Sequence, residues 1–558
     1  MNQRITPSEW SLADSFTLGL FFIAMIALVV WVLRMKEETS TDYFLAGRDA
    51  GWLAIGASIF ASNIGSEHVV GLAGAGASTG MAMAHWEMHA WLILVLGWVF
   101  VPFYSRSRVF NMPEFLERRF SPGARSFLSI ISLVSYVLTK VAVTVYAGGI
   151  VFKQVLGIES WMGIDFFWIG AIGLVIATGI YTVIGGMRSV LYTSLLQTPI
   201  LLIGSLTILV IGLSKLGGWG ELERIAGAAT TPLGDSMLAL IRSPEDPTFP
   251  WTGVLFASPI IGFWYWCTDQ YIVQRVLSGR NQAEARRGTI LGGYLKLTPV
   301  FIFLIPGLIA FALNQKGLMQ LDDPDAAFPT LVSTLLPAGM KGIVVGGLVA
   351  ALMSSLASLF NSSAMLFTVD FYKKYRPQAS EKRLVYVGRV ATGVVVVLGV
   401  LWIPVMRGMG QVLYAYLQDV QSLLAPGIAA VFLMGVFWRG ATAAGGMAGL
   451  VFGFVFGMLR LAFRVFEGSM GSAGPLYELV LALNWLHYSM ALFAASLAVI
   501  WAVSSFTEKP TPEMLHGLTY GYATPEQIAE TRSSWNQWDV MNSTIIVAVI
   551  VVFYIYFW

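Results

Sequence analysis

Apolar stretches of about 20 residues recur along nearly the whole chain, and this repetition restricts its possible folds more than any other feature. A helix rises about 1.5 Å per residue, so it needs about 20 residues to cross the roughly 30 Å hydrocarbon core of a bilayer. Of the 558 residues, 56% are hydrophobic and only 12% are charged, which is unlike a soluble domain. We therefore expect an all-α integral membrane protein, because a β-barrel would show alternating strands of about 10 residues.

Counting these stretches predicts about 14 transmembrane helices, beginning with residues 15–33, which we interpret as a retained helix and not as a signal peptide. An even number puts both termini on the same side of the membrane. If that side is the outer one, the inward loops hold most of the 34 Lys and Arg residues, as the positive-inside rule requires. We therefore predict a multi-pass protein of the plasma (inner) membrane with both termini outside.

The longer polar segments, near 215–249 and 507–537, carry no phosphate-binding loop, metal-ligand spacing or catalytic-triad motif, so we interpret them as connectors. The single cysteine, Cys267, excludes an internal disulfide framework. A net charge of +2 gives no reason to expect a nucleic acid partner, and no obligatory protein partner is evident.

One apolar stretch, residues 50–77, contains the polar run FASNIGSEH at residues 60–68. Unpaired polar groups in hydrocarbon cost several kcal/mol each, so such a run survives where it lines a cavity or binds a ligand. FASNIG at residues 60–65 is echoed by FASPIIG at residues 256–262, and polar residues follow each copy. Paired interruptions of this kind indicate an inverted-repeat transporter whose binding site lies at the repeat interface.

Several longer motifs follow one another in an order that resembles the sodium/solute symporter family, and most closely its sodium/glucose cotransporter-like branch. These motifs are YFLAGR at 43–48, SIFASNIGSEHVVGLAG at 58–74, WYWCTDQ at 264–270, IVQR at 272–275, YLKL at 294–297 and MSSLASLFNSS at 353–363. The resemblance runs from about residue 40 to 440. It implies a secondary active transporter, not an enzyme, that imports a glucose- or galactose-like hexose together with Na⁺ by alternating access.

The resemblance also implies a LeuT-like core of two inverted five-helix repeats whose first helices are discontinuous. We place the repeats at 50–214 and 249–438. An additional helix and an inner loop occupy 1–49, an extracellular connector occupies 215–248, and flanking helices with a cytoplasmic loop near 507–537 occupy 439–558.

Ionisable and polar residues within predicted spans are functional candidates, because charge at the bilayer centre costs at least about 2.5–3.5 kcal/mol. By resemblance, the residues that contact sugar are Asn63, His68, Glu87, Tyr265, Trp266, Lys296 and Gln418. The resemblance makes Tyr265 the inner gate, and Leu72, Trp86 and Tyr414 the outer lid. Two alternatives remain open: Glu87 pairs with Lys296 to hold two helices together, and His68 is a core histidine bonded to a backbone carbonyl.

Sodium prefers neutral or anionic oxygens, which a helix break supplies as carbonyls and a neighbouring helix supplies as hydroxyls. The resemblance assigns sodium to the carbonyls of Ala61, Ile64 and Ala351 and to the hydroxyls of Ser354 and Ser355. The alternative is that the two serines merely bond the carbonyls four residues earlier.

Two positions depart from the pattern of relatives that carry two sodium ions. Ser194 stands where many of them place an aspartate, and Ala357 stands where some place a threonine. Because a carboxylate and a hydroxyl are both absent, we predict one sodium per substrate.

Other substrates and activities remain as alternatives. The Ser66-Glu67-His68 run is similar to that of myo-inositol carriers, so a sodium/myo-inositol symporter is the main competitor. Carriers of sialic acid, proline or pantothenate would need a group that recognises a carboxylate, and the WYWCTDQ motif disfavours those branches. A sugar sensor and a passive channel with the same fold are further alternatives, although a channel would need no sodium site.

Overall fold

The computed structural model describes residues 5–6, 8–35, 38–65, 67–231, 233–408, 413–465 and 475–558. Within these ranges the side chains at 33, 137–139, 142, 150, 154–155, 402–403, 405–408, 413–417, 419, 465, 475–476 and 479 are not described. The described part is a bundle of helices, and a short antiparallel hairpin of β1 (Ser160–Trp161) and β2 (Ile164–Asp165) is the one sheet assigned in it.

The first half of the chain is built from α-helices and from short π-helical or 3₁₀ turns, which carry the label η. Its elements are α1 (Leu12–Leu33), α2 (Ser40–Leu45), α3 (Trp52–Asn63), η2 (Glu67–Leu72), α4 (Ala73–Ser78), α5 (Ala84–Glu87), α6 (Ala90–Val95), η4 (Leu96–Phe100), α7 (Val101–Ser107), α8 (Met112–Arg119), α9 (Pro122–Ser135), η5 (Tyr136–Val141), α10 (Ala142–Leu156), α11 (Phe166–Leu216) and α12 (Trp219–Ala228). Short 3₁₀ turns at Ala46–Arg48 and Gly80–Met83 complete this half.

The second half continues in the same way. Its elements are α13 (Trp251–Phe263), η6 (Trp264–Thr268), α14 (Gln270–Leu277), α15 (Gln282–Lys296), η7 (Val300–Leu304), α16 (Ile305–Gln315), α17 (Ala327–Leu335), α18 (Met340–Met365), η9 (Leu366–Tyr372), α19 (Lys373–Tyr375), α20 (Glu381–Gly408), α21 (Leu413–Phe437), α22 (Ala443–Val465), α23 (Pro475–Ala482), α24 (Trp485–Ser505), α25 (Pro512–Leu515), α26 (Pro525–Ser533) and α27 (Gln537–Tyr556). A 3₁₀ turn, η8 (Pro324–Ala326), precedes α17.

Ten helices in the described part are long and apolar enough to cross a membrane. One of them, α11, has 51 residues, and its helical geometry is interrupted at Gly186, where φ is 47° and ψ is −144°. Only glycine suits this position, because a Cβ would also lie 2.4 Å from the carbonyl oxygen of Tyr43. A helix of that length is more than twice what one crossing needs, so α11 can supply two crossings. The predicted total of about 14 stays a prediction.

Both helices that the sequence analysis expects to be broken are broken. Helix α3 ends at Asn63 because Ile64 is extended, and the chain continues as η2 and α4. Helix α13 runs into η6 and stops at Asp269, which is extended and accepts a hydrogen bond from the Tyr271 backbone N–H as the N-cap of α14. Each break exposes backbone carbonyls that a continuous helix would have used in its own ladder.

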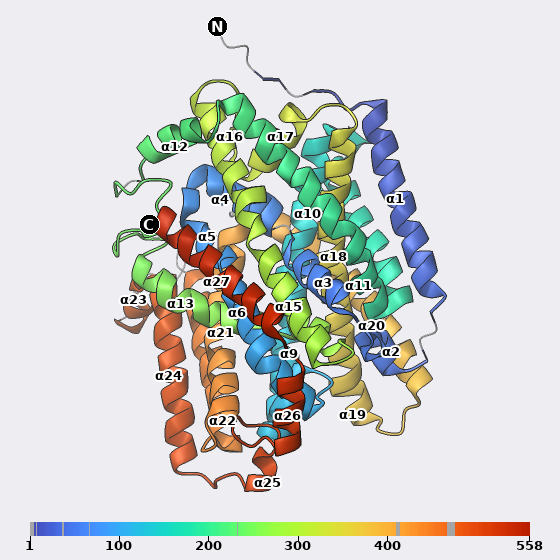
Figure 1. Ribbon diagram of the computed structural model, residues 1–558, viewed down its shortest axis with the longest axis vertical. Coiled ribbons are helices and arrows are strands. Elements are labelled where there is room, and N and C mark those ends of the chain that lie inside the picture. The colour runs from blue at the N-terminus through green and yellow to red at the C-terminus, as the bar shows by residue number, and fades with distance from the viewer. Residues whose placement is uncertain are drawn as a thin grey trace.

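Helix α18 lies inside the bundle and packs against α11, α3 and α20. In the most apolar 18-residue stretch of the span Met340–Tyr375, which contains α18, 94% of the residues are buried. Figure 1 shows α1 and α24 at opposite edges of the bundle, where their apolar side chains are largely exposed, as expected for lipid-facing helices. The start of α1 and the end of α27 lie in the half of the molecule that also holds α12 and α17, whereas α25 and α26 lie in the other half (Figure 1). The repeat and connector boundaries given above stay a prediction.

The turn before α17 carries an acid with a perturbed pKa. Asp325 in η8 packs against α4, so that a Cβ on Gly74 would lie 2.5 Å from its Oδ1. Burial, with a smaller effect from Asp323, raises the pKa of Asp325 from 3.8 to about 6. Between these values Asp325 therefore binds more protons in the folded protein than in the unfolded chain, so the contribution of this carboxyl to stability falls as the pH rises through that window.

We expect Asp325→Asn to change the difference in apparent Tm between about pH 5 and about pH 7.5 in favour of pH 7.5, relative to the wild type, as measured by thermal unfolding at both pH values. Asp322→Asn, in the exposed part of the same turn, is the matched control and should leave the difference unchanged. An unaltered pH difference in Asp325→Asn would contradict the prediction.

Candidate functional site

A cavity of about 50 Å³ lies between the first broken helix, η6, α15 and α21. Its lining residues are Asn63, Glu67, His68, Trp86, Glu87, His89, Ile261, Gly262, Tyr265, Trp266, Lys296, Gln418 and Gln421. The structure thus brings all seven predicted sugar-contact residues to one cavity, although they are spread over more than 350 positions of sequence. Their role in binding a substrate stays a prediction.

Three of these residues form a buried charge cluster. Lys296 Nζ donates a hydrogen bond of 2.6 Å to Glu87 Oε2, and His68 Nε2 lies 3.4 Å from Glu87 Oε1. The Asn63 amide nitrogen lies 3.3 Å from the same His68 nitrogen. Lys296 is the last residue of α15, where the helix dipole favours a cation, and Pro299 interrupts the regular helix just beyond it. Of the two alternatives considered above, the Glu87–Lys296 pair is therefore present in the structure.

Polar atoms with unused hydrogen-bonding capacity also line the cavity. His68 Nδ1, Trp86 Nε1 and Gln418 Oε1 are buried and have no hydrogen-bond partner in the described part of the chain. Buried polar atoms are normally satisfied, so such exceptions require an explanation. A hydroxyl-rich ligand would supply both donors and acceptors to this set.

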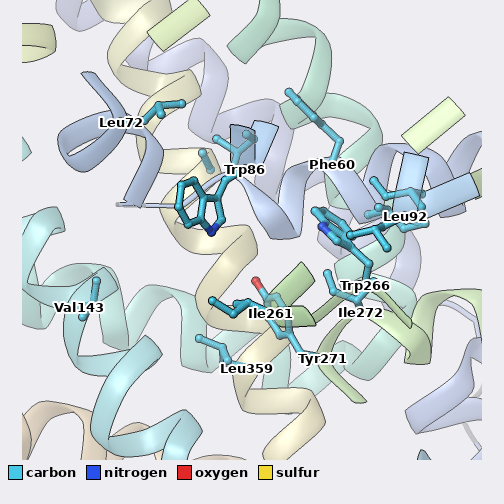
Figure 2. Close-up of a cluster of buried hydrophobic side chains, with 14 of the residues drawn as sticks. Phe60, Leu72, Trp86, Leu92, Val143, Ile261, Trp266, Tyr271, Ile272 and Leu359 are labelled. Carbon is cyan, nitrogen blue, oxygen red and sulfur yellow. The ribbon is translucent and has the colours of Figure 1, made fainter. Parts of the chain in front are cut away.

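Aromatic side chains form the remaining walls. The rings of Tyr265 and Trp266 meet edge to face with centroids 4.9 Å apart, and Lys296 Nζ lies 5.4 Å from the Trp266 ring centroid. Trp86 is stacked on Trp485 of α24 with centroids 5.9 Å apart. Figure 2 shows Trp86, Trp266 and Leu72 within the same buried cluster.

The predicted outer lid is described only in part. Leu72 is fully buried, and Trp86 is packed between α24 and Phe249, which lies just before α13. The Tyr414 side chain lies outside the described residues, as does Ser66. The gate assignments stay predictions.

The hydroxyls proposed for sodium lie on α18 where it meets the α3 break. Ser354 and Ser355 are buried, and a Cβ on Gly65 would lie 3.2 Å from Ser355 Oγ, so the broken backbone approaches α18 closely. Ser354 Oγ lies 3.4 Å from Ser194 Oγ of α11, whereas Ser355 Oγ lies 3.2 Å from the Tyr271 hydroxyl of α14. These cross-helix contacts differ from the bond that Ser358 makes to the carbonyl of Ser354, four residues earlier.

The direction of one hydrogen bond leaves Ser355 suited to a cation. The Tyr271 hydroxyl donates its proton to the carbonyl of Ser62, which is in the last turn of α3. Its oxygen must therefore accept from Ser355, because a phenol carries a single proton. The oxygen lone pairs of Ser355 remain available to a hard cation, which prefers oxygen ligands.

The profile of the family described as "Sodium:solute symporter family" matches residues 43–453, which is most of the chain. The chain belongs to the sodium:solute symporter family. It is 38% identical over 537 residues to Sodium/myo-inositol cotransporter 2 of Homo sapiens, covering 91% of this chain and 78% of the relative. It is also 37% identical over 539 residues to Sodium/glucose cotransporter 4 of Danio rerio, covering 91% of this chain and 81% of the relative.

The fold of this symporter matches that of a solved structure. The structure titled "Substrate-bound outward-open state of a Na+-coupled sialic acid symporter reveals a novel Na+-site" superimposes with a TM-score of 0.71 at 21% sequence identity. The alignment covers 90% of this chain and 99% of the other. The predicted all-α, LeuT-like membrane fold is confirmed. The protein is a multi-pass, sodium-coupled solute symporter and not an enzyme, and sodium is its coupling ion.

The sequence analysis omitted several cavity residues of this symporter. Glu67 lies in the same predicted span as Asn63 and His68 but was not placed among the sugar-contact residues, and neither were His89 and Gln421. His89 Nε2 lies 3.2 Å from Ser258 Oγ, so it joins α13 to the segment between α5 and α6. The rule that polar residues within apolar spans are functional candidates applies equally to His89, and that signal was present in the sequence.

Proposed function

We propose that this symporter imports a neutral, polyhydroxylated ring, with a glucose- or galactose-like hexose as the first candidate. The observation that carries the proposal is the commitment of Lys296 to Glu87. Lys296 is the one lysine or arginine among the described residues that line the cavity, so no unpaired cation is offered there to a substrate carboxylate. Donors and acceptors beside an aromatic wall suit hydroxyl groups and the apolar face of a sugar ring.

myo-Inositol is the second candidate, and two observations favour it. Glu67 adds an acceptor to the cavity wall, which suits a ring with a hydroxyl on every carbon. Sodium/myo-inositol cotransporters are also among the relatives that share 36–38% of aligned residues with this chain.

Uptake into proteoliposomes tests both candidates. We expect labelled glucose or galactose to accumulate in sodium buffer and not in choline buffer. Preferential accumulation of myo-inositol would select the second candidate, whereas accumulation of sialic acid would refute a neutral substrate. Equal uptake in both buffers would indicate a passive channel, and binding without uptake would indicate a sensor.

The two broken helices support transport by alternating access. Sodium bridges the α3 break and Ser355 on α18 and thereby favours the outward-open arrangement, in which the cavity residues converge. When sodium leaves towards the cytoplasm, the substrate is released past Tyr265. The ion can shift the population of states only by the difference between its affinities for them. We place both termini outside the plasma membrane, in line with the distribution of Lys and Arg.

We predict that one sodium ion enters per substrate molecule. Ser194 offers a hydroxyl, which donates to the carbonyl of Val190, where a carboxylate would attract a second ion. One sodium yields about 2.3 kcal/mol per 100 mV plus about 1.4 kcal/mol per tenfold gradient, enough for accumulation of a few hundredfold.

The ratio of labelled sodium to labelled substrate taken up by voltage-clamped proteoliposomes measures the stoichiometry, and we expect about one. A ratio of two would refute the single-ion prediction without affecting the proposed substrate.

A further inference from the structure

An additional buried ion pair lies next to the cavity, and neither the charge cluster nor the candidate sodium site uses it. Lys140 in η5 places its Nζ 3.2 Å from Asp269 Oδ2 at the break between η6 and α14. Both side chains are more than nine-tenths buried. The Tyr136 hydroxyl donates to the other carboxylate oxygen of Asp269, which also accepts from the Tyr271 backbone N–H. The ion pair is thereby fixed to the second broken helix.

The Lys140 ammonium also contacts two tyrosine rings that belong to different sites. Its Nζ lies 4.4 Å from the ring centroid of Tyr265 and 4.4 Å from that of Tyr271. Both distances are within the range of cation–π attraction, which strengthens when the cation is removed from water. Tyr265 lines the substrate cavity. Tyr271 extends its hydroxyl to the candidate sodium site, where it bonds the Ser62 carbonyl and the Ser355 hydroxyl.

These contacts form a continuous path between the two sites. It runs from Ser355 on α18 through Tyr271 to Lys140, and from Lys140 to Tyr265. Tyr271 is fully buried within the main hydrophobic cluster, as Figure 2 shows, so its ring cannot move without displacing its neighbours. A shift of the α3 break relative to α18 moves the groups that hold the Tyr271 hydroxyl, and the shared ammonium passes that displacement to Tyr265.

We propose that Lys140 and Tyr271 are positioning residues that couple sodium occupancy at Ser355 to the inner gate at Tyr265. The inference rests on the proposed function, because it requires sodium and a neutral ring to bind at these two sites. Neither residue touches the substrate or the ion in this scheme. Each acts through another side chain, Lys140 through Tyr265 and Tyr271 through Ser355.

Equilibrium binding measures this coupling directly. Purified full-length protein in nanodiscs is titrated with tritium-labelled glucose and, separately, myo-inositol, with and without sodium. The ratio of the two Kd values for a substrate is the coupling factor, and reciprocity requires the substrate to change the sodium affinity by the same factor. If a variant fails to fold, the number of binding sites per protein molecule falls. If the relay is lost, sodium changes the substrate affinity less, and the substrate changes the sodium affinity less, by the same factor.

Three variants separate the parts of the relay. Lys140→Met/Asp269→Asn removes both charges without leaving one unpaired, and asparagine can still cap α14. We expect its coupling factor to fall at least about fivefold towards one, with an unchanged number of binding sites. Lys140→Arg keeps a cation for the rings and should retain coupling. Tyr271→Phe keeps the ring but loses the hydroxyl, so we expect sodium affinity to fall by about tenfold with the sodium-free substrate Kd unchanged.

Lys153→Met is the matched control, because Lys153 lies on the adjoining helix α10 and pairs with Glu159 and Asp165 at the surface. Its coupling factor should equal that of the wild type. A wild-type coupling factor in Lys140→Met/Asp269→Asn would overturn the relay while leaving the proposed function intact. If sodium has no effect on wild-type binding of either probe, the proposed function fails and the relay fails with it.

Discussion

We expect a Lys296→Met/Glu87→Gln double variant to fold and reach the membrane but to take up substrate at least about 100-fold more slowly than the wild-type symporter. The two side chains are joined by a 2.6 Å hydrogen bond and are almost completely buried in the cavity wall. Hydrogen bonds to charged groups contribute about 1.5–3 kcal/mol, and 1.4 kcal/mol corresponds to tenfold in affinity. Removing the charged donor and the charged acceptor together should therefore lower the rate of substrate uptake by two powers of ten or more.

The single variants separate a structural pair from a substrate-binding pair. Lys296→Met leaves the Glu87 carboxylate with His68, 3.4 Å away, as its remaining partner in the charge cluster. Breaking a buried ion pair from one side costs about 3–5 kcal/mol, so we expect less folded protein in the membrane for each single variant. The double variant carries no orphan charge and should recover the folded yield, as measured by size-exclusion chromatography of the detergent-solubilised protein.

The matched control is Lys316→Met/Glu221→Gln, which removes a 2.9 Å ion pair between α12 and the end of α16. Exposed pairs contribute little, so its uptake should stay within about twofold of the wild type. If the Lys296→Met/Glu87→Gln variant instead transports at close to the wild-type rate, the pair only holds α5 against α15, and the sugar-contact assignment of both residues is wrong.

The sequence predicts those parts of the fold that depend on residues close together in the chain, such as a polar run inside an apolar stretch. The breaks in α3 and α13 were predicted from polar runs inside apolar stretches, because hydrocarbon penalises such runs wherever the helix lies. The Glu87–Lys296 pair was anticipated as an alternative for the same reason, since opposite charges within the membrane must find partners.

The parts that sequence did not predict depend on which distant segments meet. Lys140 and Asp269 are both ionisable residues within apolar stretches. Their pairing across 129 positions, however, follows only from the packing of η5 against the second break. The contact of His85 Nδ1 with the Tyr554 hydroxyl, at 2.6 Å, joins α5 to the last helix over 469 positions. No pattern within a single sequence identifies such partners, because the side chains are compatible with many others.

We expect Ser355→Ala to raise the sodium concentration for half-maximal uptake by about tenfold or more, with little change in substrate affinity at saturating sodium. The substitution removes one proposed oxygen ligand and keeps the volume of the side chain nearly constant. It leaves the hydrogen bond from the Tyr271 hydroxyl to the Ser62 carbonyl in place, so the break keeps this anchor. Initial uptake rates measured over a series of sodium concentrations, with ionic strength held constant by choline, give the half-saturation value.

Two comparisons decide whether the effect arises from the lost ligand. Ser363→Ala removes a buried hydroxyl from the same helix, two turns from Ser355, and its Oγ has no hydrogen-bond partner in the described part of the chain. Sodium dependence in this control should match the wild type. Ser355→Thr retains the hydroxyl, so its half-saturating sodium concentration should be closer to that of the wild type than the value for Ser355→Ala is. If all three variants keep the wild-type half-saturation, sodium does not bind at Ser355. The carbonyls of the α3 break would then have to bind the ion with other oxygens, and the relay through Tyr271 would lose its starting point.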